Sequence, residues 1–318
     1  MAEQREFFLE AGPGTVHWGF FDANLKPALK VPSGAVVGFG TEPAAVPEIV
    51  EEMKPRSTEA FRRIVASHAK GPSSHLMTGP VYVEGAEPGD VLEVYFRSIR
   101  FRYDWGFNAI IPLKGGLAEE YPSLGFIFPA IDKAGRTASW KNIGPLPLAP
   151  FFGDVGVAPP ASLGRVPSGI PGAWGGNMDC KELVEGTKLL LPVFNKGALF
   201  SMGDGHACQG DGEVNSFALE TGLDADVRLR VIKDRTLRVP MILTPTHTVF
   251  MGFDPILDNA AKKALREAVE YISSECGYSS EDAYALCSMA GDLRITQIVN
   301  GTKGAHFMIA NALLEKAK

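Results

Sequence analysis

Eleven residues in the middle of the chain carry a high density of side chains that could do chemistry. Residues 203–213 read Gly-Asp-Gly-His-Ala-Cys-Gln-Gly-Asp-Gly-Glu, with three carboxylates, one imidazole and one amide among four glycines. Carboxylates and imidazole are the usual ligands of divalent metals, and glycine lets the backbone approach a ligand closely. Apolar runs at 189–194 and 198–200 precede the segment. We therefore expect a site where the chain leaves an apolar core.

Polar residues two positions apart occur three times in and near this segment. In an extended strand such residues face the same side. The three pairs would therefore converge on one pocket if their segments are neighbours in a sheet. Taken singly, Asn and Asp next to Gly are ordinary turn formers, but together with His206 and Gln209 they indicate a site. The pairs are Asn177 with Asp179, Asp204 with His206, and Asp211 with Glu213.

Several other residues are weaker candidates. A histidine in an apolar segment, such as His17, is more often a satisfied core residue, and Asp22 is typical of a turn. For His75, a structural role at the start of a strand and a functional role are equally supported. A nucleophilic thiol needs a base and a lowered pKa. Cys208, two residues from the histidine of the motif, keeps an acyl-enzyme mechanism open, and Cys180 has a weaker claim.

The bulk properties limit the class of protein. The 318 residues are 45% hydrophobic, which allows one large domain or two modest ones. A net charge of −6 and the lack of a Lys/Arg stripe argue against a nucleic-acid partner. No apolar run is long enough for a signal peptide or a membrane span. The four cysteines form no CxxC pair, so we expect reduced thiols in a cytoplasmic protein.

The spacing of apolar residues predicts a mostly β fold with a few helices (α+β). Short apolar runs alternate with glycine and proline between about residues 10 and 250. A strand–turn–strand pattern recurs at 31–39, 82–96 and 191–200, and each copy predicts a hairpin. Together they suggest duplicated β motifs forming a barrel or sandwich core. Exposed sheet edges need cover, so we expect a homo-oligomer.

Helical signals are confined to two regions. One helix is expected over 57–69, capped by Ser57 or Thr58. The region 257–290 should hold a long helix up to Gly277 and a shorter one capped by Ser279 or Ser280. The Gly- and Pro-rich segment 105–175 contains three tryptophans. Its composition predicts a long excursion of loops that covers another part of the protein.

Four motifs resemble the acetamidase/formamidase family, in the same order and over nearly the whole chain. The resemblance implies a single domain over 1–318, with two β-rich sub-structures of about 1–150 and 151–318 as a variant. It also implies hydrolysis of a short-chain amide to carboxylate and ammonia, and a divalent metal. The sequence His-Trp-Gly-Phe-Phe-Asp at 17–22 departs from the more usual pattern, which leaves the substrate open. The motifs lie at residues 78–90, 175–179, 203–213 and 290–300.

A metal-activated water would supply the nucleophile for this reaction. We assign Asp179, Asp204 and His206 to the metal, with His17 and Asp22 as weaker members of the same shell. Zinc suits a His/Asp site with an open position. A carboxylate-rich site suits calcium, which is the candidate for a second ion.

The remaining roles concern the water and the substrate. Glu213 is assigned as general base, with Glu84 in reserve. Asn177 and Gln209 would hydrogen-bond the amide or the developing oxyanion. Three aromatic side chains would close a small apolar pocket around the acyl group. They are Trp18, Trp105 and Phe107.

Two other functions fit the same residues. The segment 105–175 leaves room for hydrolysis of another C–N bond, as in a cyclic or urea-like amide. The polar residues could also belong to a non-catalytic metal- or small-molecule-binding protein on the same scaffold. Release of ammonia from formamide and acetamide would distinguish these functions.

Overall fold

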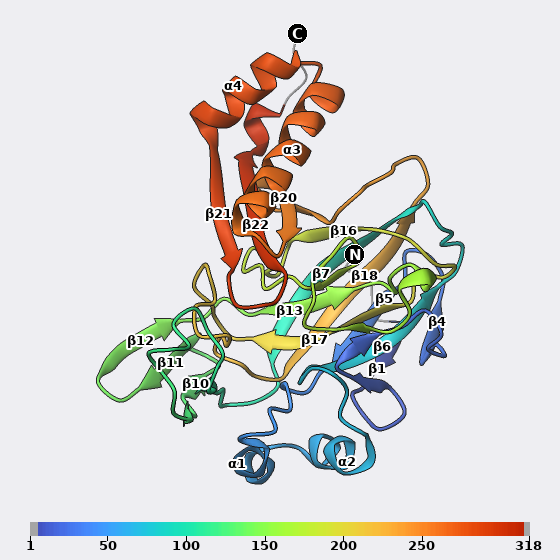
Figure 1. Cartoon of the computed structure of the whole chain (residues 1–318). Helices are drawn as coiled ribbons and strands as arrows, with labels where there is room; N and C mark the ends of the chain where they lie inside the picture. The colour runs from blue at the N-terminus through green and yellow to red at the C-terminus, as the bar shows by residue number, and fades with distance from the viewer. Residues whose placement is uncertain (1–5, 315–318) are drawn as a thin grey trace.

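The computed structural model describes residues 6–314 and has two large β-sheets packed against each other (Figure 1). The chain is mostly β, as predicted. Across the described residues both large sheets stay open at their ends, so the architecture is a sandwich rather than a barrel. No helix among residues 6–314 has both the length and the apolar character needed to cross a bilayer.

The larger sheet has nine strands and takes members from both ends of the chain. Its strands on either side of residue 150 are interleaved rather than separated. In spatial order they are β1 (Phe7–Leu9), β5 (Val36–Gly40), β18 (Leu223–Ile232), β7 (Val91–Phe101), β16 (Lys188–Pro192), β19 (Met241–Leu243), β20 (His247–Asp254), β22 (Lys303–Ala310) and β21 (Gly291–Gln297).

The second sheet has six strands and carries most of the candidate site residues. In spatial order they are β15 (Gly175–Asn177), β13 (Phe151–Gly156), β17 (Phe200–His206), β6 (Leu76–Val83) and β2 (Val16–Trp18), with β4 (Leu29–Val31) parallel to β6. Three smaller pairings complete the strands. They are β10 (Ala130–Asp132) with β11 (Thr137–Trp140) and β12 (Ile143–Pro147), β3 (Phe20–Phe21) with β14 (Val166–Pro167), and β8 (Asn108–Ile110) with β9 (Gly125–Ile127).

Buried aromatic side chains join the two large sheets. The rings of Phe39 and Phe200 meet edge to face at 5.8 Å, and those of Phe96 and Phe152 stack at 6.3 Å. Each of these pairs takes one ring from each sheet, and all four rings belong to one apolar core. Aromatic pairs at these distances stabilise a core beyond the area they bury. The core holds β13 and β17 rigidly, and these strands carry the candidate site.

The three strand–turn–strand segments are not the hairpins that the sequence predicts. In each one the two strands belong to different large sheets: β4 and β5, β6 and β7, β16 and β17. The turns of the last two copies bond to each other, with Gly89 N donating to Val193 O at 2.9 Å and Val193 N donating to Asp90 O at 2.9 Å. The pattern marks a turn between two strands, but only long-range pairing decides which sheet each strand joins.

The predicted helices are confirmed together with their caps. In α2 (Glu59–Ser67), Thr58 Oγ1 accepts from Phe61 N at 3.1 Å. α3 (Leu257–Cys276) ends at Gly277, whose φ of +81° is left-handed. α4 (Ser280–Ala290) starts at Ser279, which caps Asp282 N. Not predicted were α1 (Val50–Met53) and three 3₁₀ turns, η1 (Lys54–Arg56), η2 (Ala161–Leu163) and η3 (Asn311–Leu313).

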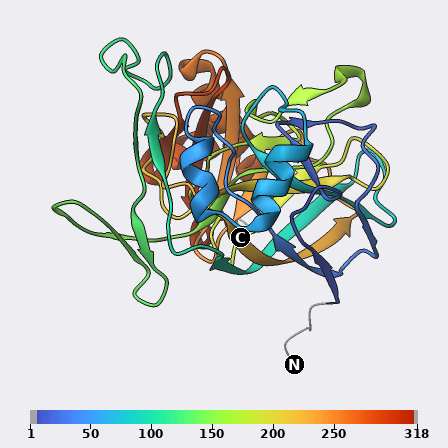
Figure 2. The same ribbon diagram turned by 90° about the horizontal axis from the view of Figure 1, so that it is seen from below.

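The helices cover two ends of the sandwich. α3 packs on β20 and β22, and with α4 and β21 it forms the projecting unit at the top of Figure 1. α1 and α2 lie together at the opposite end, in front of the sandwich in Figure 2. Gly252 allows the close approach of α3, because a Cβ there would collide with the backbone of Ala260 and Ala264.

Segment 105–175 is not the uninterrupted excursion that its composition suggests. It contains the β8–β9 hairpin and the three-stranded sheet β10–β12, which projects at the lower left of Figure 1. It also contains β13, which lies between β15 and β17 in the six-stranded sheet. Glycine and proline in this segment therefore mark turns between short strands.

Candidate active site

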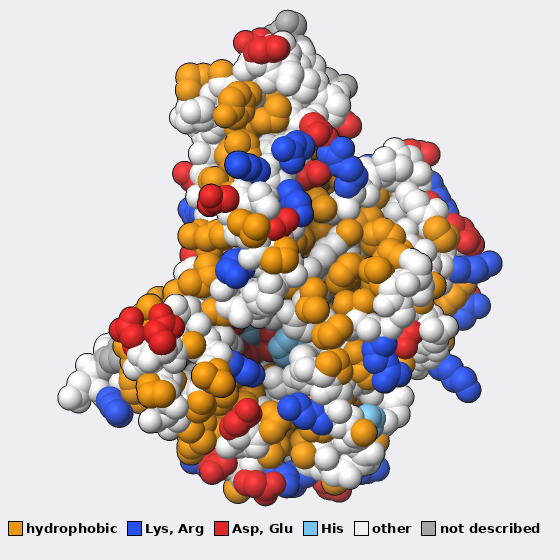
Figure 3. Space-filling model, viewed as in Figure 1, with side chains coloured by type: hydrophobic (Ala, Val, Ile, Leu, Met, Phe, Trp, Pro, Cys, Tyr) orange, Lys and Arg blue, Asp and Glu red, His pale blue; other side chains and the backbone are white. Residues whose placement is uncertain are grey.

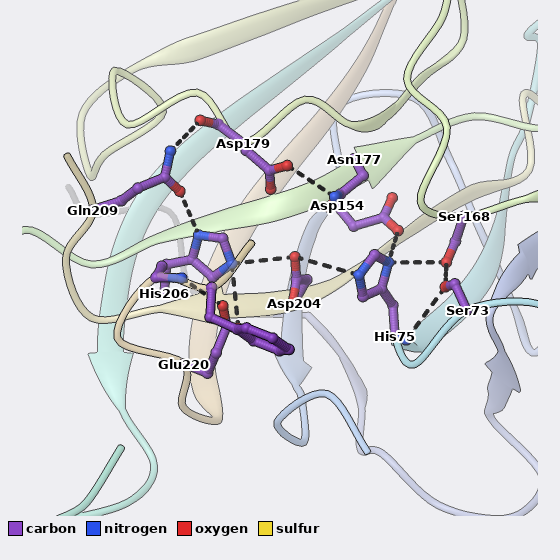
Figure 4. Close-up of polar contacts among 12 residues, drawn as sticks. Ser73, His75, Asp154, Ser168, Asn177, Asp179, Asp204, His206, Gln209 and Glu220 are labelled. Carbon is purple, nitrogen blue, oxygen red and sulfur yellow. Dashed lines mark hydrogen bonds and ion pairs between the residues drawn. The ribbon is translucent and has the colours of Figure 1, made fainter. Parts of the chain in front are cut away.

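Three neighbouring strands bring the central polar residues together. β13 lies between β15 and β17, with Asp154 opposite Asn177 on one side and Gly203 on the other. At this place His206 Nε2 lies 3.2 Å from Asp204 Oδ2 and 3.3 Å from Glu220 Oε2 (Figure 4). All three side chains are buried. We call the five residues Asp179, Asp204, His206, Glu213 and Glu220 the polar cluster.

Gln209 fixes the orientation of the His206 ring. Its Oε1 accepts from Nδ1 of His206 at 2.9 Å, and its Nε2 donates to the backbone oxygen of Asp179 at 2.7 Å. Burial opposes a charge on His206, but Glu220 and Asp204 raise the pKa of the imidazole well above its ordinary value. Both ends of the Gln209 amide are thus engaged within the protein, where they hold the imidazole ring in place.

Asp179 presents one free oxygen. Its Oδ2 accepts from Asn177 Nδ2 at 2.8 Å and from Asn300 Nδ2 at 2.9 Å. Its Oδ1 is buried and has no hydrogen-bond partner. Burial raises the pKa of Asp179 to about 7, although the charge on His206 acts in the opposite direction. Two amides therefore hold one oxygen of the carboxylate, while the other has no hydrogen-bond partner among the described residues.

The space next to Gly153 is lined by side chains that could hold a metal ion. A Cβ at Gly153 would lie 2.6 Å from Asp179 Oδ1 and 2.7 Å from both Asp204 Oδ2 and His206 Cε1. Two sets of potential ligands surround this place, and within each set the donor atoms lie within 4.8 Å of one another. Nitrogen and carboxylate donors in such a group suit zinc. The sets are Asp179, His206 and Glu213, and Asp204, His206 and Glu220.

Three carboxylates of the polar cluster sit on strained backbone. The φ angles of Asp179, Asp204 and Glu213 are +52°, +58° and +44°. Non-glycine residues rarely adopt this left-handed region, and such strain concentrates at functional sites. The tip of the β21–β22 hairpin supports the loop before Glu213, since Gly212 N donates to Thr296 O at 3.1 Å. Tertiary contacts therefore hold conformations that the local sequence would not favour.

A second histidine extends the polar cluster. His75 Nδ1 lies 2.9 Å from both Asp154 Oδ2 and Ser168 Oγ, and its Nε2 lies 3.9 Å from Asp204 Oδ2. Burial works against a charged ring, but Asp204 and Asp154 raise the pKa of His75 to about 9. Despite burial, His75 and His206 hold the pKa of Asp204 well below its usual range.

A cavity of about 350 Å³ opens onto the polar cluster. Figure 3 shows it as a hollow with acidic and histidine side chains at its base. Two asparagines also face it. The side chains at its base are His75, Asn177, Asp204, Glu213, Glu220 and Asn300.

The two weaker metal candidates lie apart from the polar cluster. Both ring nitrogens of His17 are engaged, Nδ1 with Phe20 O at 2.6 Å and Nε2 with Ser201 Oγ at 2.9 Å. Burial lowers the pKa of His17 to about 4, as expected for a neutral core imidazole. Asp22 accepts from Asn24 in a turn and pairs with Arg165. The structure does not place either residue with the other candidate ligands.

The reserve base and the aromatic residues also lie elsewhere. Glu84 is half-exposed and pairs with Lys30 at 3.0 Å in the turn that follows β6. The tryptophans belong to a separate apolar core beneath α1 and α2, where Trp105 Nε1 donates to Arg56 O at 2.9 Å. None of these side chains lines the cavity described above. The three aromatic residues are Trp18, Trp105 and Phe107.

The cysteines lack the environment of a nucleophile. Burial raises the pKa of the Cys208 thiol, and it raises that of Cys180 further. A catalytic thiol requires the opposite shift. All four cysteines are free thiols, as the sequence suggests.

Three residues of the site were not assigned from the sequence. Asn300 lies within one of the motifs that carry the family resemblance, so a signal for it was present. Asp154 stands between glycines of β13, a pattern too common to interpret. Glu220 has no local signal, because a backbone bridge to His206 brings it into place.

The fold and the site can now be compared with those of known protein families. The model of the acetamidase/formamidase family matches residues 67–166 and 168–309. The chain therefore belongs to the acetamidase/formamidase family, whose members are amidohydrolases that act on linear amides.

Individual relatives agree with this assignment. The chain is 28% identical to the formamidase of Methylophilus methylotrophus over 68% of its own length and 70% of that protein. It is 26% identical to the acetamidase of Mycolicibacterium smegmatis over 67% and 72% of the two chains. Among solved structures, an acetamidase from Bacillus halodurans matches with a TM-score of 0.84 and 30% identity, covering 96% of this chain and 98% of the other.

Proposed function

We propose that this protein hydrolyses a short-chain aliphatic amide of the formamide or acetamide type with the help of a divalent metal in the polar cluster. The observation that carries the proposal is the buried carboxylate oxygen Asp179 Oδ1, which has no hydrogen-bond partner and lies beside the space at Gly153. Buried acceptors of this kind are costly unless a ligand satisfies them. The names of the relatives support the choice of substrate.

Asp179 and His206 belong to one donor set and Asp204 and His206 to the other, and these three residues would hold the ion, which we take to be zinc. Calcium as a second ion would need further oxygen ligands, because the set that Glu220 completes includes an imidazole. A bound divalent ion lowers the pKa of a water molecule and polarises a carbonyl group. Gln209 keeps the imidazole of His206 in the required orientation through its 2.9 Å contact with Nδ1.

Glu213 is the proton carrier in this proposal. Its side chain faces the cavity, and burial together with the charge of Asp179 raises its pKa well above the ordinary value. A carboxylate with a raised pKa is a better proton acceptor near neutral pH. It would take a proton from the attacking water and deliver it to the departing nitrogen.

Asn177 would orient the substrate. Its Nδ2 is bonded to Asp179, whereas its buried Oδ1 has no partner and the residue lines the cavity. An amide oxygen in that position accepts a hydrogen bond from the N–H of a substrate amide. This favours a primary amide over an ester of the same shape.

The direct test is ammonia release from formamide, acetamide, propionamide and a bulky aryl amide, before and after chelation, with zinc or calcium restored. We expect metal-dependent turnover that falls as the acyl group grows. Preference for a cyclic or urea-like amide would favour another C–N hydrolase. No release from any amide by folded, metal-loaded protein would favour a non-catalytic binding protein.

Gly153→Ala tests the metal position without removing a polar group. The added methyl would occupy the space among Asp179, Asp204 and His206, so bound metal and turnover should both be lost. Gly144→Ala is the matched control, because a Cβ there meets nothing within 4 Å. Full metal content and full rate in Gly153→Ala would contradict the assignment.

The cytoplasmic location and the homo-oligomer remain predictions.

A further inference from the structure

Two basic side chains stand at the mouth of the cavity. Lys70 follows α2, and Lys114 lies in the loop between β8 and β9. Both are exposed, and within residues 6–314 neither ammonium group has an ion-pair partner. Figure 3 shows basic side chains beside the hollow. Glu48 is the acidic residue at the same mouth, so its three charged side chains sum to one positive charge.

The base of the cavity has the opposite character. Three carboxylates line it beside the imidazole of His75. The ammonium groups at the mouth, rather than these carboxylates, would pair with an anionic group. A substrate with a charged end would therefore enter with its neutral amide first. The three carboxylates are Asp204, Glu213 and Glu220.

The cavity is also larger than the simplest amides require. Its volume is about 350 Å³, whereas formamide has only three non-hydrogen atoms and acetamide four. Polar side chains such as Ser74 and Ser216 line the cavity together with apolar ones such as Leu113 and Phe217. An apolar acyl chain would leave both ammonium groups without a partner in the cavity, whereas a carboxylate would pair with them.

We propose that the preferred substrate is a short amide that carries a carboxylate at its other end, the monoamide of a small dicarboxylic acid. The amide lies at the polar cluster, and the carboxylate binds Lys114 and Lys70 at the mouth. Water and this substrate give the dicarboxylate and ammonia. The inference rests on the proposed amidase function and adds the substrate class.

The experiment compares two amides of equal size that differ in charge. Succinamate and 4-methylpentanamide each have eight non-hydrogen atoms, with an isopropyl group in place of the carboxylate. The ratio of their kcat/KM values reports on recognition of the charge. Turnover of acetamide monitors amide hydrolysis itself. For the wild-type protein we expect a ratio of about ten or more in favour of succinamate, falling as salt is added.

Charge reversal at the mouth should change this ratio. Lys114→Glu should lower it about tenfold, mainly through the KM for succinamate, and Lys70→Glu should act in the same direction. Glu48→Gln should raise it. Lys196→Glu is the control, because Lys196 lies on another surface beside Glu87 and should leave the ratio unchanged.

The outcomes separate this inference from the proposed function. Acetamide turnover without preference for succinamate would overturn the substrate class and leave the amidase intact. A ratio that Lys114→Glu and Lys196→Glu change equally would overturn the role of the mouth. Failure to hydrolyse any of the three amides would overturn the proposed function, and the substrate class with it.

Discussion

Two buried histidines of the six-stranded sheet differ in their neighbours and in the direction in which their pKa is shifted. His17, on β2, is 5% exposed, and His206, at the end of β17, is fully buried. A carbonyl and a hydroxyl face His17, and burial lowers its pKa to about 4. Two carboxylates face His206, and against the effect of burial they raise its pKa well above the ordinary value.

The comparison shows that neighbours, rather than burial, decide what a core histidine does. Desolvation disfavours the charged ring at both places, and only a nearby negative charge reverses that effect. The carbonyl at His17 satisfies one ring nitrogen and leaves a neutral packing residue. The carboxylates at His206 raise the pKa of its ring, and such a perturbed group among other titratable side chains is typical of a ligand or catalytic site.

The largest expected effect is the loss of catalysis in His206→Asn. Turnover should fall at least about 100-fold, because the variant removes a donor that belongs to both ligand sets. Bound metal should fall with it, and both are measured by ammonia release and by metal analysis. His17→Asn is the matched control and should keep its metal. Equal losses from the two substitutions would break the comparison.

Asn300→Ala should have an intermediate effect. Removing its 2.9 Å hydrogen bond loosens Asp179, and the loss of such a supporting contact typically costs 10- to 100-fold in metal affinity. Metal affinity is measured by titration of the metal-free protein. Asn259→Ala removes a similar amide–carboxylate contact, to Asp254 on the surface, and should leave metal affinity unchanged. Equal affinity in both variants would show that Asn300 does not position Asp179.

The pH dependence of stability should sharpen the contrast between the two histidines. The pKa of His17 is about 4 in the folded protein, against an ordinary 6.5, so the unfolded chain binds more protons between these values. Stability from this group is therefore present above pH 6.5 and is lost as the pH falls to 4, by about 3 kcal/mol in total.

Urea unfolding of the wild type and His17→Gln at pH 7.5 and pH 5 measures this effect. All other groups are shared, including His306, whose pKa burial also lowers to about 4, so the difference between the proteins isolates His17. The wild type should lose more stability on acidification than the variant. Parallel losses would mean that the ring of His17 is not held neutral.

The smallest expected effect is that of Glu84→Gln. Its pair with Lys30 is half-exposed and screened by solvent, so it contributes little to stability, and the residue lies outside the cavity. Turnover of acetamide should stay within about twofold of the wild type. A large loss of turnover would indicate that Glu84 takes part in the reaction, and it would weaken the assignment of Glu213 as general base.

Local signals account for what could be predicted. The caps Thr58 and Ser279 and the left-handed Gly277 act within one turn of helix, so they can be read from neighbouring residues. The glycine-rich motif 203–213 predicts the site for a similar reason, because its polar residues lie close together in the chain. Residues two apart on a strand share a face, which places Asp204 beside His206.

Other features depended on distant parts of the chain. Pairing of β13 with β15 and β17 brings Asp154 and Asp179 to the site, and the β21–β22 hairpin brings Asn300. Neighbouring sequence does not encode which sheet a strand joins, and the expected hairpins at 31–39, 82–96 and 191–200 were wrong for that reason.

The sequence by itself determined the β-rich class, the helices, the family and the central ligand motif, because each depends on residues close together in the chain. The tertiary structure alone decided that His17 faces a carbonyl and a hydroxyl whereas His206 faces two carboxylates, that Glu84 stays outside the cavity and Glu220 lines it, and that two lysines stand at its mouth. These outcomes follow from burial and charge between segments far apart in sequence, and such interactions exist only after the chain has folded.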